Sequence, residues 1–72
     1  MVHYDVALWL SWPALFPEYV EVVEALTPID AVYILMHRYC LQRVSRAAIS
    51  DGQAPIRRYF GVVCPEDEEV MR

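Results

Sequence analysis

Apolar side chains recur at every second position between residues 2 and 10, with mostly polar or smaller residues between them. A period of two is typical of a strand that buries one of its faces. The side expected to be buried consists of Val2, Tyr4, Val6, Leu8 and Leu10. We therefore predict an N-terminal strand at about residues 2–10, with a short helix as the alternative.

The apolar pattern changes to helical spacing after Pro17. Proline suits the first position of a helix, because its missing N–H would have no partner there in any case. Three glutamates then occupy a different side from the apolar residues, as in an amphipathic helix. The apolar side consists of Tyr19, Val20, Val23 and Leu26. This pattern predicts a first helix at about residues 17–26.

A second helix start follows directly. Thr27 offers an N-cap hydroxyl, Pro28 suits the first helical position, and Asp30 places a carboxylate in the first turn. One apolar stripe continues to about Ser50, formed by Ile29, Val32, Tyr33, Met36, Cys40, Val44 and Ala47. We predict a second helix at about residues 28–50. The alternative is that residues 32–36, rich in β-branched and aromatic side chains, form a buried strand.

The last ordered pattern is another alternation, at residues 56–64. A turn around Gly52 and Pro55 precedes it, so it predicts a C-terminal strand or wing. The contiguous carboxylates that follow indicate a solvated acidic tail at residues 65–72. The expected fold class is therefore α+β, a single compact domain at residues 1–64 with two central helices between two strands. An all-α fold is the alternative.

The chain is richer in apolar residues than a domain of this size can bury. Of its 72 residues, 57% are apolar and only 22% are charged, and a chain this short buries only about 60% of its surface on folding. The predicted second helix is also apolar on two sides. One side can pack against the rest of the domain, and the other needs a second copy or a partner to bury it. We expect a homodimer or higher homo-oligomer. The expected oligomer or partner interface consists of Trp9, Trp12, Ile34, Leu35 and Leu41.

All cations are arginines, and five of the six fall within one window of 21 residues. Guanidinium groups favour planar contacts with phosphate or carboxylate. Three of the five share one side of the predicted second helix, and the other two follow on the predicted wing. The predicted binding residues are Arg38, Arg43, Arg46, Arg57 and Arg58. This order favours a small regulatory nucleic-acid-binding protein that uses a helix and a wing on DNA.

Overall charge supports a different interpretation of the same arginines. The net charge is −4, which repels a polyanion at long range. Glu18, Glu21 and Glu24 also offer carboxylates to the guanidinium groups, within one chain or between chains. The alternative function is therefore a non-catalytic protein-interaction module or inhibitor that acts as a homo-oligomer and binds an acidic protein surface.

Most constellations that carry catalysis are missing from the sequence. Without lysine there is no Schiff base and no phosphate-binding P-loop lysine. His37 has no carboxylate four residues later to orient it as a base. Cys40 and Cys64 lack CxxC spacing, and nothing in the sequence places His3 with them around a metal. We expect no catalytic residue, no cofactor and no metal, and two reduced thiols.

Localisation is predicted from the apolar runs. The longest of them, residues 6–16, is interrupted by Ser11 and Pro13, and it is too short to cross about 30 Å of hydrocarbon. The chain also starts without the basic segment of a secretory signal. We therefore expect a cytoplasmic protein with no membrane association.

Overall fold

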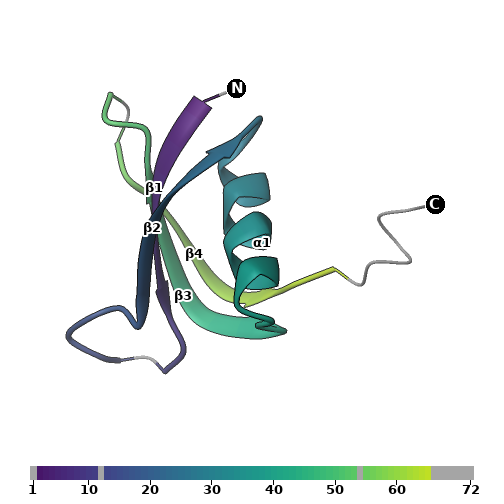
Figure 1. Ribbon diagram of the computed structural model, residues 1–72. Coiled ribbons are helices and arrows are strands. Elements are labelled where there is room, and N and C mark those ends of the chain that lie inside the picture. Colours follow the sequence, from purple (N-terminus) through teal and green to yellow (C-terminus); the bar gives the residue numbers. More distant parts are fainter. Residues whose placement is uncertain (1, 12, 54, 66–72) are drawn as a thin grey trace.

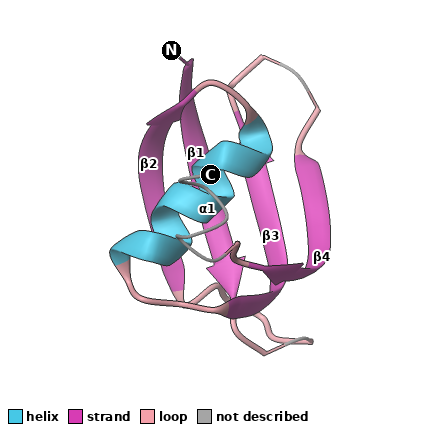
Figure 2. Cartoon of the chain, turned by 90° about the vertical axis from the view of Figure 1, so that its right-hand side faces the viewer, coloured by secondary structure: helices cyan, strands magenta, loops and turns pink. Residues whose placement is uncertain are grey.

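A computed structural model describes residues 2–11, 13–53 and 55–65, and it shows a four-stranded antiparallel sheet with a helix on one side (Figures 1 and 2). The elements in chain order are β1 (Val2–Trp9), β2 (Tyr19–Ala25), α1 (Pro28–Arg38), β3 (Arg43–Ser50) and β4 (Arg57–Val63). The strand order is β2-β1-β3-β4, so α1 connects two hairpins and returns the chain beside β1. The α+β class is confirmed. The all-α alternative and the claim of two helices are wrong.

The predicted N-terminal strand is confirmed as β1, a central strand of the sheet. Tyr4, Val6 and Leu8 are buried on the face that meets α1, as the alternation predicted. Asp5, on the other face, is exposed. A central position gives β1 hydrogen-bonding partners along both of its edges, β2 on one side and β3 on the other.

The predicted helix at residues 17–26 is wrong, because residues 19–25 form β2. Their apolar positions fit two periods at once. Val20 and Val23 are three apart, as on a helix, but Val23 and Ala25 also form the buried half of a period-two pattern. The three valines of this segment favour a strand, because their branched side chains lose rotamer freedom in a helix. Pairing with β1 from Val2–Ala25 to Leu8–Tyr19 then selects the strand.

The start of the predicted second helix is confirmed. The Thr27 hydroxyl oxygen accepts a hydrogen bond from the Asp30 backbone N–H at 3.3 Å, and Pro28 occupies the first helical position. Residues 32–36 are helical, so their alternative assignment as a strand is wrong. The predicted end near Ser50 is also wrong, since α1 ends at Arg38.

The helix ends in a Schellman motif. Cys40 adopts a left-handed backbone conformation, with φ of 57°. Its N–H donates to the His37 carbonyl at 3.2 Å, and the Leu41 N–H donates to the Met36 carbonyl at 2.8 Å. Glycine normally occupies this position, because other residues pay a steric cost there. A cysteine in this position is not a recognisable signal for the end of a helix. The predicted helix therefore extended too far, to about Ser50.

Residues 43–50 form β3 rather than the second half of a helix. Arginine and alanine favour helices, but β3 lies between β1 and β4 and exchanges backbone hydrogen bonds with both. Ala47 and Ile49 are buried against α1. Tertiary pairing therefore overrides the local preference of this segment.

The predicted C-terminal strand is confirmed as β4, but its alternation is interrupted. Val62 is buried, and so is its β3 partner Val44, whereas Phe60 and Arg46 pair on the opposite face. Gly61, between them, has φ of 61° and changes the direction in which the strand presents its side chains. Of the predicted acidic tail, residues 66–72 lie outside the described residues.

The core lies between α1 and strands β2, β1 and β3. Four helix side chains form its upper layer: Ala31, Val32, Leu35 and Met36. They are fully buried, as are Val6, Leu8 and Val44 beneath them. In the described ranges no helix is long and apolar enough to cross a membrane.

Candidate functional site

The sheet has one face that no helix or strand covers in the described part of the chain (Figure 1). Helix α1 occupies the other face alone. We call the uncovered side the open face. Its residues are His3, Asp5, Ala7 and Trp9 of β1, Val20, Val22 and Glu24 of β2, Arg43, Arg46, Ala48 and Ser50 of β3, and Arg58, Phe60 and Val63 of β4.

A row of three paired residues crosses the open face at one end. Trp9 pairs with Arg46, and Arg46 pairs with Phe60. The guanidinium carbon of Arg46 lies 4.6 Å from the Trp9 ring centroid and 5.9 Å from that of Phe60. These distances allow cation–π attraction to both rings. Arg46 therefore covers Trp9, which is only 9% exposed, while Phe60 is 61% exposed.

The next row is apolar and flat. Val20 pairs with Ala7, Ala7 pairs with Ala48, and Ala48 pairs with Arg58. Val20 is 63% exposed and its neighbour on the same strand, Val22, is 58% exposed. Valine side chains on one strand beside two small alanines leave an apolar strip without projections. Such a strip suits contact with another flat surface.

Opposite charges occupy two diagonal corners of the open face. Arg43 and Arg58 are exposed on β3 and β4, next to Arg46. Asp5 and Glu24 are exposed on β1 and β2 towards the other end. The imidazole Nε2 of neighbouring His3 lies 3.9 Å from a Glu24 carboxylate oxygen. The open face is therefore basic at one corner and acidic at the other.

The five predicted arginines do not form one surface. Arg38 lies at the end of α1 and makes an ion pair with Glu21 of β2 on the helix side. Arg57 also lies on the helix side, where it lines a small pocket. Only Arg43, Arg46 and Arg58 share the open face. The expected common side for Arg38, Arg43 and Arg46 is wrong, because α1 ends before the last two.

The residues predicted at an interface also separate. Trp9 lies on the open face, and Trp12 lies outside the described residues. Ile34 is partly exposed on the side of α1 away from the sheet. Leu35 is fully buried and Leu41 half-buried in the core, so Leu35 is unavailable to a partner of the folded chain.

Sequence reasoning missed the apolar part of the open face, Val20, Val22 and Phe60. The signal was present in the alternation of residues 19–25, where the outward positions are Val20, Val22 and Glu24. In the predicted helix, Val20 and Val22 would point to nearly opposite sides, so they did not appear as neighbours. A period-two interpretation would have placed them side by side on an exposed face.

The β1–β2 loop borders the open face at the end that carries Trp9. In Figure 1 this loop swings to the side of the sheet away from α1. Its base is held by Glu18, whose carboxylate accepts from the Leu10 N–H at 2.7 Å, and by Ser45, whose hydroxyl donates to the Leu10 carbonyl at 2.8 Å. Leu15 and Phe16 in this loop are 90% and 78% exposed. They extend the apolar surface beyond the sheet.

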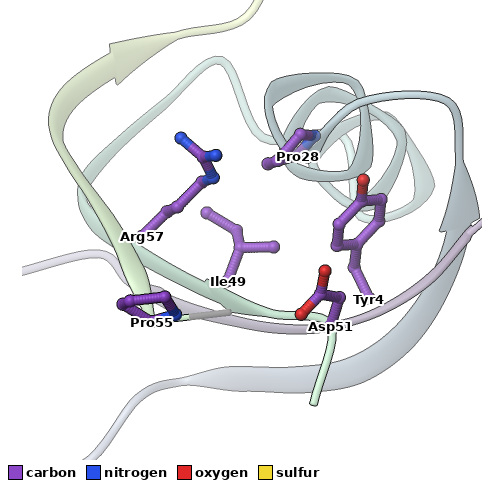
Figure 3. Close-up of a pocket in the computed structure, with 6 residues that line it drawn as sticks. All are labelled: Tyr4, Pro28, Ile49, Asp51, Pro55 and Arg57. Atoms are coloured by element: carbon purple, nitrogen blue, oxygen red, sulfur yellow. The ribbon is translucent and has the colours of Figure 1, made fainter. Parts of the chain in front are cut away.

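A separate small pocket lies on the helix side of the molecule, between the start of α1 and the β3–β4 connection (Figure 3). Its volume is about 110 Å³. The lining residues are Tyr4, Pro28, Ile49, Asp51, Pro55 and Arg57. It therefore combines an apolar floor with charged groups of both signs.

The candidate ligands for a metal do not converge. Cys40 is exposed after α1 and Cys64 is half-buried after β4, and neither is in a disulfide bond. In the described ranges no three histidine, cysteine or acidic side chains are close enough together to hold a metal ion.

No protein-family model matches this chain, and no match was found among curated protein sequences or among solved structures.

Proposed function

We propose that this protein is a non-catalytic interaction module that acts as a homodimer, with the open face of one copy packed on the open face of the other. The observation that carries the proposal is the exposed apolar surface of the open face. Val20 and Val22 lie on the edge strand β2, Phe60 lies on the other edge strand β4, and each is more than half exposed, with Ala7 and Ala48 on the strands between them. Soluble monomers rarely leave a large contiguous apolar patch in water. A sheet with one uncovered apolar face commonly buries that face by packing against a second sheet.

A second copy suits this surface because its charges are self-complementary. In a two-fold interface the same patch meets itself, so each basic group must find an acidic group of the same patch. The open face supplies Arg46 and Arg58 at one corner and Asp5 and Glu24 at the other. Such a two-fold axis lies between the two faces, perpendicular to the line that joins the basic corner to the acidic corner. It places the basic corner of each copy over the acidic corner of its partner.

This axis also sets the angle between the two sheets. Exchanging diagonal corners makes the strands of the two copies cross at a steep angle. Near-orthogonal crossing is one of the two geometries in which sheets pack face to face. The alanines Ala7 and Ala48 lie at the centre of the face, where the two backbones would approach most closely.

Charge reversal tests the proposed pairing. Size-exclusion chromatography with light scattering should find a dimer for the natural chain. Arg58→Glu and Glu24→Arg should each produce monomers, because each places like charges opposite one another, and the double variant should restore the dimer. Arg57→Glu is the matched control, since this neighbouring arginine lies on the helix side. A natural chain that stays monomeric at high concentration, or a double variant that fails to recover, contradicts the proposal.

A second candidate function is binding of single-stranded nucleic acid on the same face. The observation in its favour is that Arg46 lies over the exposed Phe60 ring, with Arg58 two residues before it on β4 and Arg43 further along β3 on the same face. Aromatic side chains on a sheet stack with bases, and the neighbouring cations bind the phosphates. A recognition helix followed by a wing is not the geometry here, because residues 38–46 leave α1, turn and enter β3.

The two functions respond differently to salt. Several phosphate contacts make the affinity for a fluorescent oligonucleotide fall steeply as salt rises. Dimerisation through an apolar strip depends on salt far less, because the main contribution is burial of apolar surface. Binding of the oligonucleotide that falls with salt and is lost in both Arg58→Gln and Phe60→Ala would favour the nucleic-acid function. No binding at low salt would exclude it.

A further inference from the structure

The pocket on the helix side is built at the meeting point of three elements. Tyr4 comes from β1 and Ile49 from β3, and Pro28 is the first residue of α1. Its volume of about 110 Å³ is well below that of sites for drug-sized ligands, but it exceeds the space that a single water needs. The pocket therefore has room for a molecule of a few heavy atoms.

Charged groups of opposite sign stand on opposite sides of this pocket. Figure 3 shows Arg57 on one side of the Ile49 side chain and Asp51 on the other. The Asp51 carboxylate is positioned by the Gln53 N–H, which donates to it at 2.9 Å. No ion pair or hydrogen bond within the described residues occupies the Arg57 guanidinium. A ligand with both a carboxylate and a cation would match this arrangement.

Tyr4 adds a hydrogen-bonding group to the pocket. Its side chain is buried, with only 7% of the residue exposed, and its hydroxyl points into the pocket towards Pro28 (Figure 3). Within the described ranges this hydroxyl makes no hydrogen bond. The hydroxyl oxygen itself is not fully buried, so it faces water through the open side of the pocket. A ligand oxygen in the pocket would replace that water as the partner of the hydroxyl.

We infer that this pocket binds a small zwitterion, an α-amino acid with a short aliphatic side chain. Arg57 pairs with the ligand carboxylate, for which the planar guanidinium offers two parallel donors. The Tyr4 hydroxyl donates to the same carboxylate, and Asp51 accepts from the ammonium group. The aliphatic side chain lies on the floor formed by Ile49 and the two prolines, where it leaves water.

A simple anion fits the pocket less well than a zwitterion. The Asp51 carboxylate repels a bare carboxylate bound at Arg57, whereas an ammonium group on the ligand turns this repulsion into attraction. An amine alone lacks the group that Arg57 and Tyr4 recognise. The selectivity expected from the structure is therefore for the molecule that carries both charges.

Three small compounds test this selectivity on the full chain. L-valine carries both charged groups, isovalerate is the same skeleton without the ammonium, and isobutylamine is the same skeleton without the carboxylate. Titration followed by backbone amide chemical shifts should show L-valine shifting Ile49, Asp51 and Arg57, with the other two compounds at least about tenfold weaker. Absence of any shift with L-valine at tens of millimolar, or equal affinity for isovalerate, would overturn the inference.

Variants connect the binding to the named side chains. Arg57→Gln should weaken L-valine binding by about tenfold or more, which corresponds to the loss of about 1.4 kcal/mol. Tyr4→Phe should weaken it several-fold while keeping the buried ring, and Asp51→Asn should reduce the preference for L-valine over isovalerate. Arg43→Gln, on the opposite side of the sheet, is the control and should bind as the natural chain does. Retained binding in Arg57→Gln, in a variant whose amide spectrum shows the native fold, would refute the assignment. These outcomes are independent of dimerisation, because the pocket lies on the helix side.

Discussion

The strongest test of the proposed dimer is truncation of Phe60, the exposed aromatic side chain of the open face. Phe60 is 61% exposed, and an aromatic side chain buries about 150–250 Å², so roughly 90–150 Å² is available for burial against a partner. At about 25 cal/mol per Å² this area is worth roughly 2–4 kcal/mol in each copy. A two-fold interface contains the side chain twice. With half of the area buried, Phe60→Ala should cost about 2–4 kcal/mol in total, or roughly 30-fold to 1,000-fold in the dimer Kd.

Sedimentation equilibrium at several protein concentrations measures that Kd directly. The matched control is Ile34→Ala, which removes an exposed apolar side chain from the side of α1 away from the sheet. It should leave the Kd unchanged. Thermal unfolding by circular dichroism should show that both variants remain folded. A Phe60→Ala variant with the Kd of the natural chain would refute packing through the open face, because Phe60 could not then be buried in the interface.

Three further predictions concern the fold itself, each measured as the free energy of unfolding in urea. Leu35→Ala should destabilise the chain by about 2–5 kcal/mol, because it leaves a cavity at a fully buried position; a loss below about 1 kcal/mol would show that α1 is not packed as described. Gly61→Ala should cost about 1–2 kcal/mol from its positive φ alone, since nothing lies within 4 Å of an added Cβ. Gly61→Asn should cost less, because asparagine tolerates this conformation, and equal losses would point to a different cause. Thr27→Ala should cost about 1 kcal/mol by removing the N-cap of α1, whereas Thr27→Ser should be nearly neutral; similar losses in both would argue against a capping role.

The candidate site was only partly accessible to sequence reasoning. The excess of apolar residues predicted that some of them stay exposed, as Val20, Val22 and Phe60 do, whereas an interface role for Trp9 on the open face stays a prediction. Val20 and Val22 were missed, because a segment that satisfies both a helical and a period-two pattern does not reveal which side chains are neighbours. The pocket was missed as well. Tyr4, Asp51 and Arg57 are far apart in sequence, and no spacing rule brings them together.

Local chemistry in the sequence determined the features that depend on neighbouring residues alone. The alternation of residues 2–10 specified β1, and the Thr27-Pro28-Asp30 sequence specified the start of α1, because capping needs only the Thr27 hydroxyl and an N–H three residues later. The arginine composition was equally evident. Its division between two sides of the sheet was not.

Only the tertiary structure decided that residues 19–25 and 43–50 form strands and not helices. Both segments have apolar patterns compatible with a helix, and a helix satisfies its backbone hydrogen bonds within itself. A strand satisfies them through residues distant in sequence, so its stability depends on β1 being available on one side of each segment. The left-handed turn at Cys40 made that pairing possible by ending α1 early. The same pairing left Val20 and Val22 exposed on the open face, and pairing between β3 and β4 placed Phe60 at the opposite edge of that face.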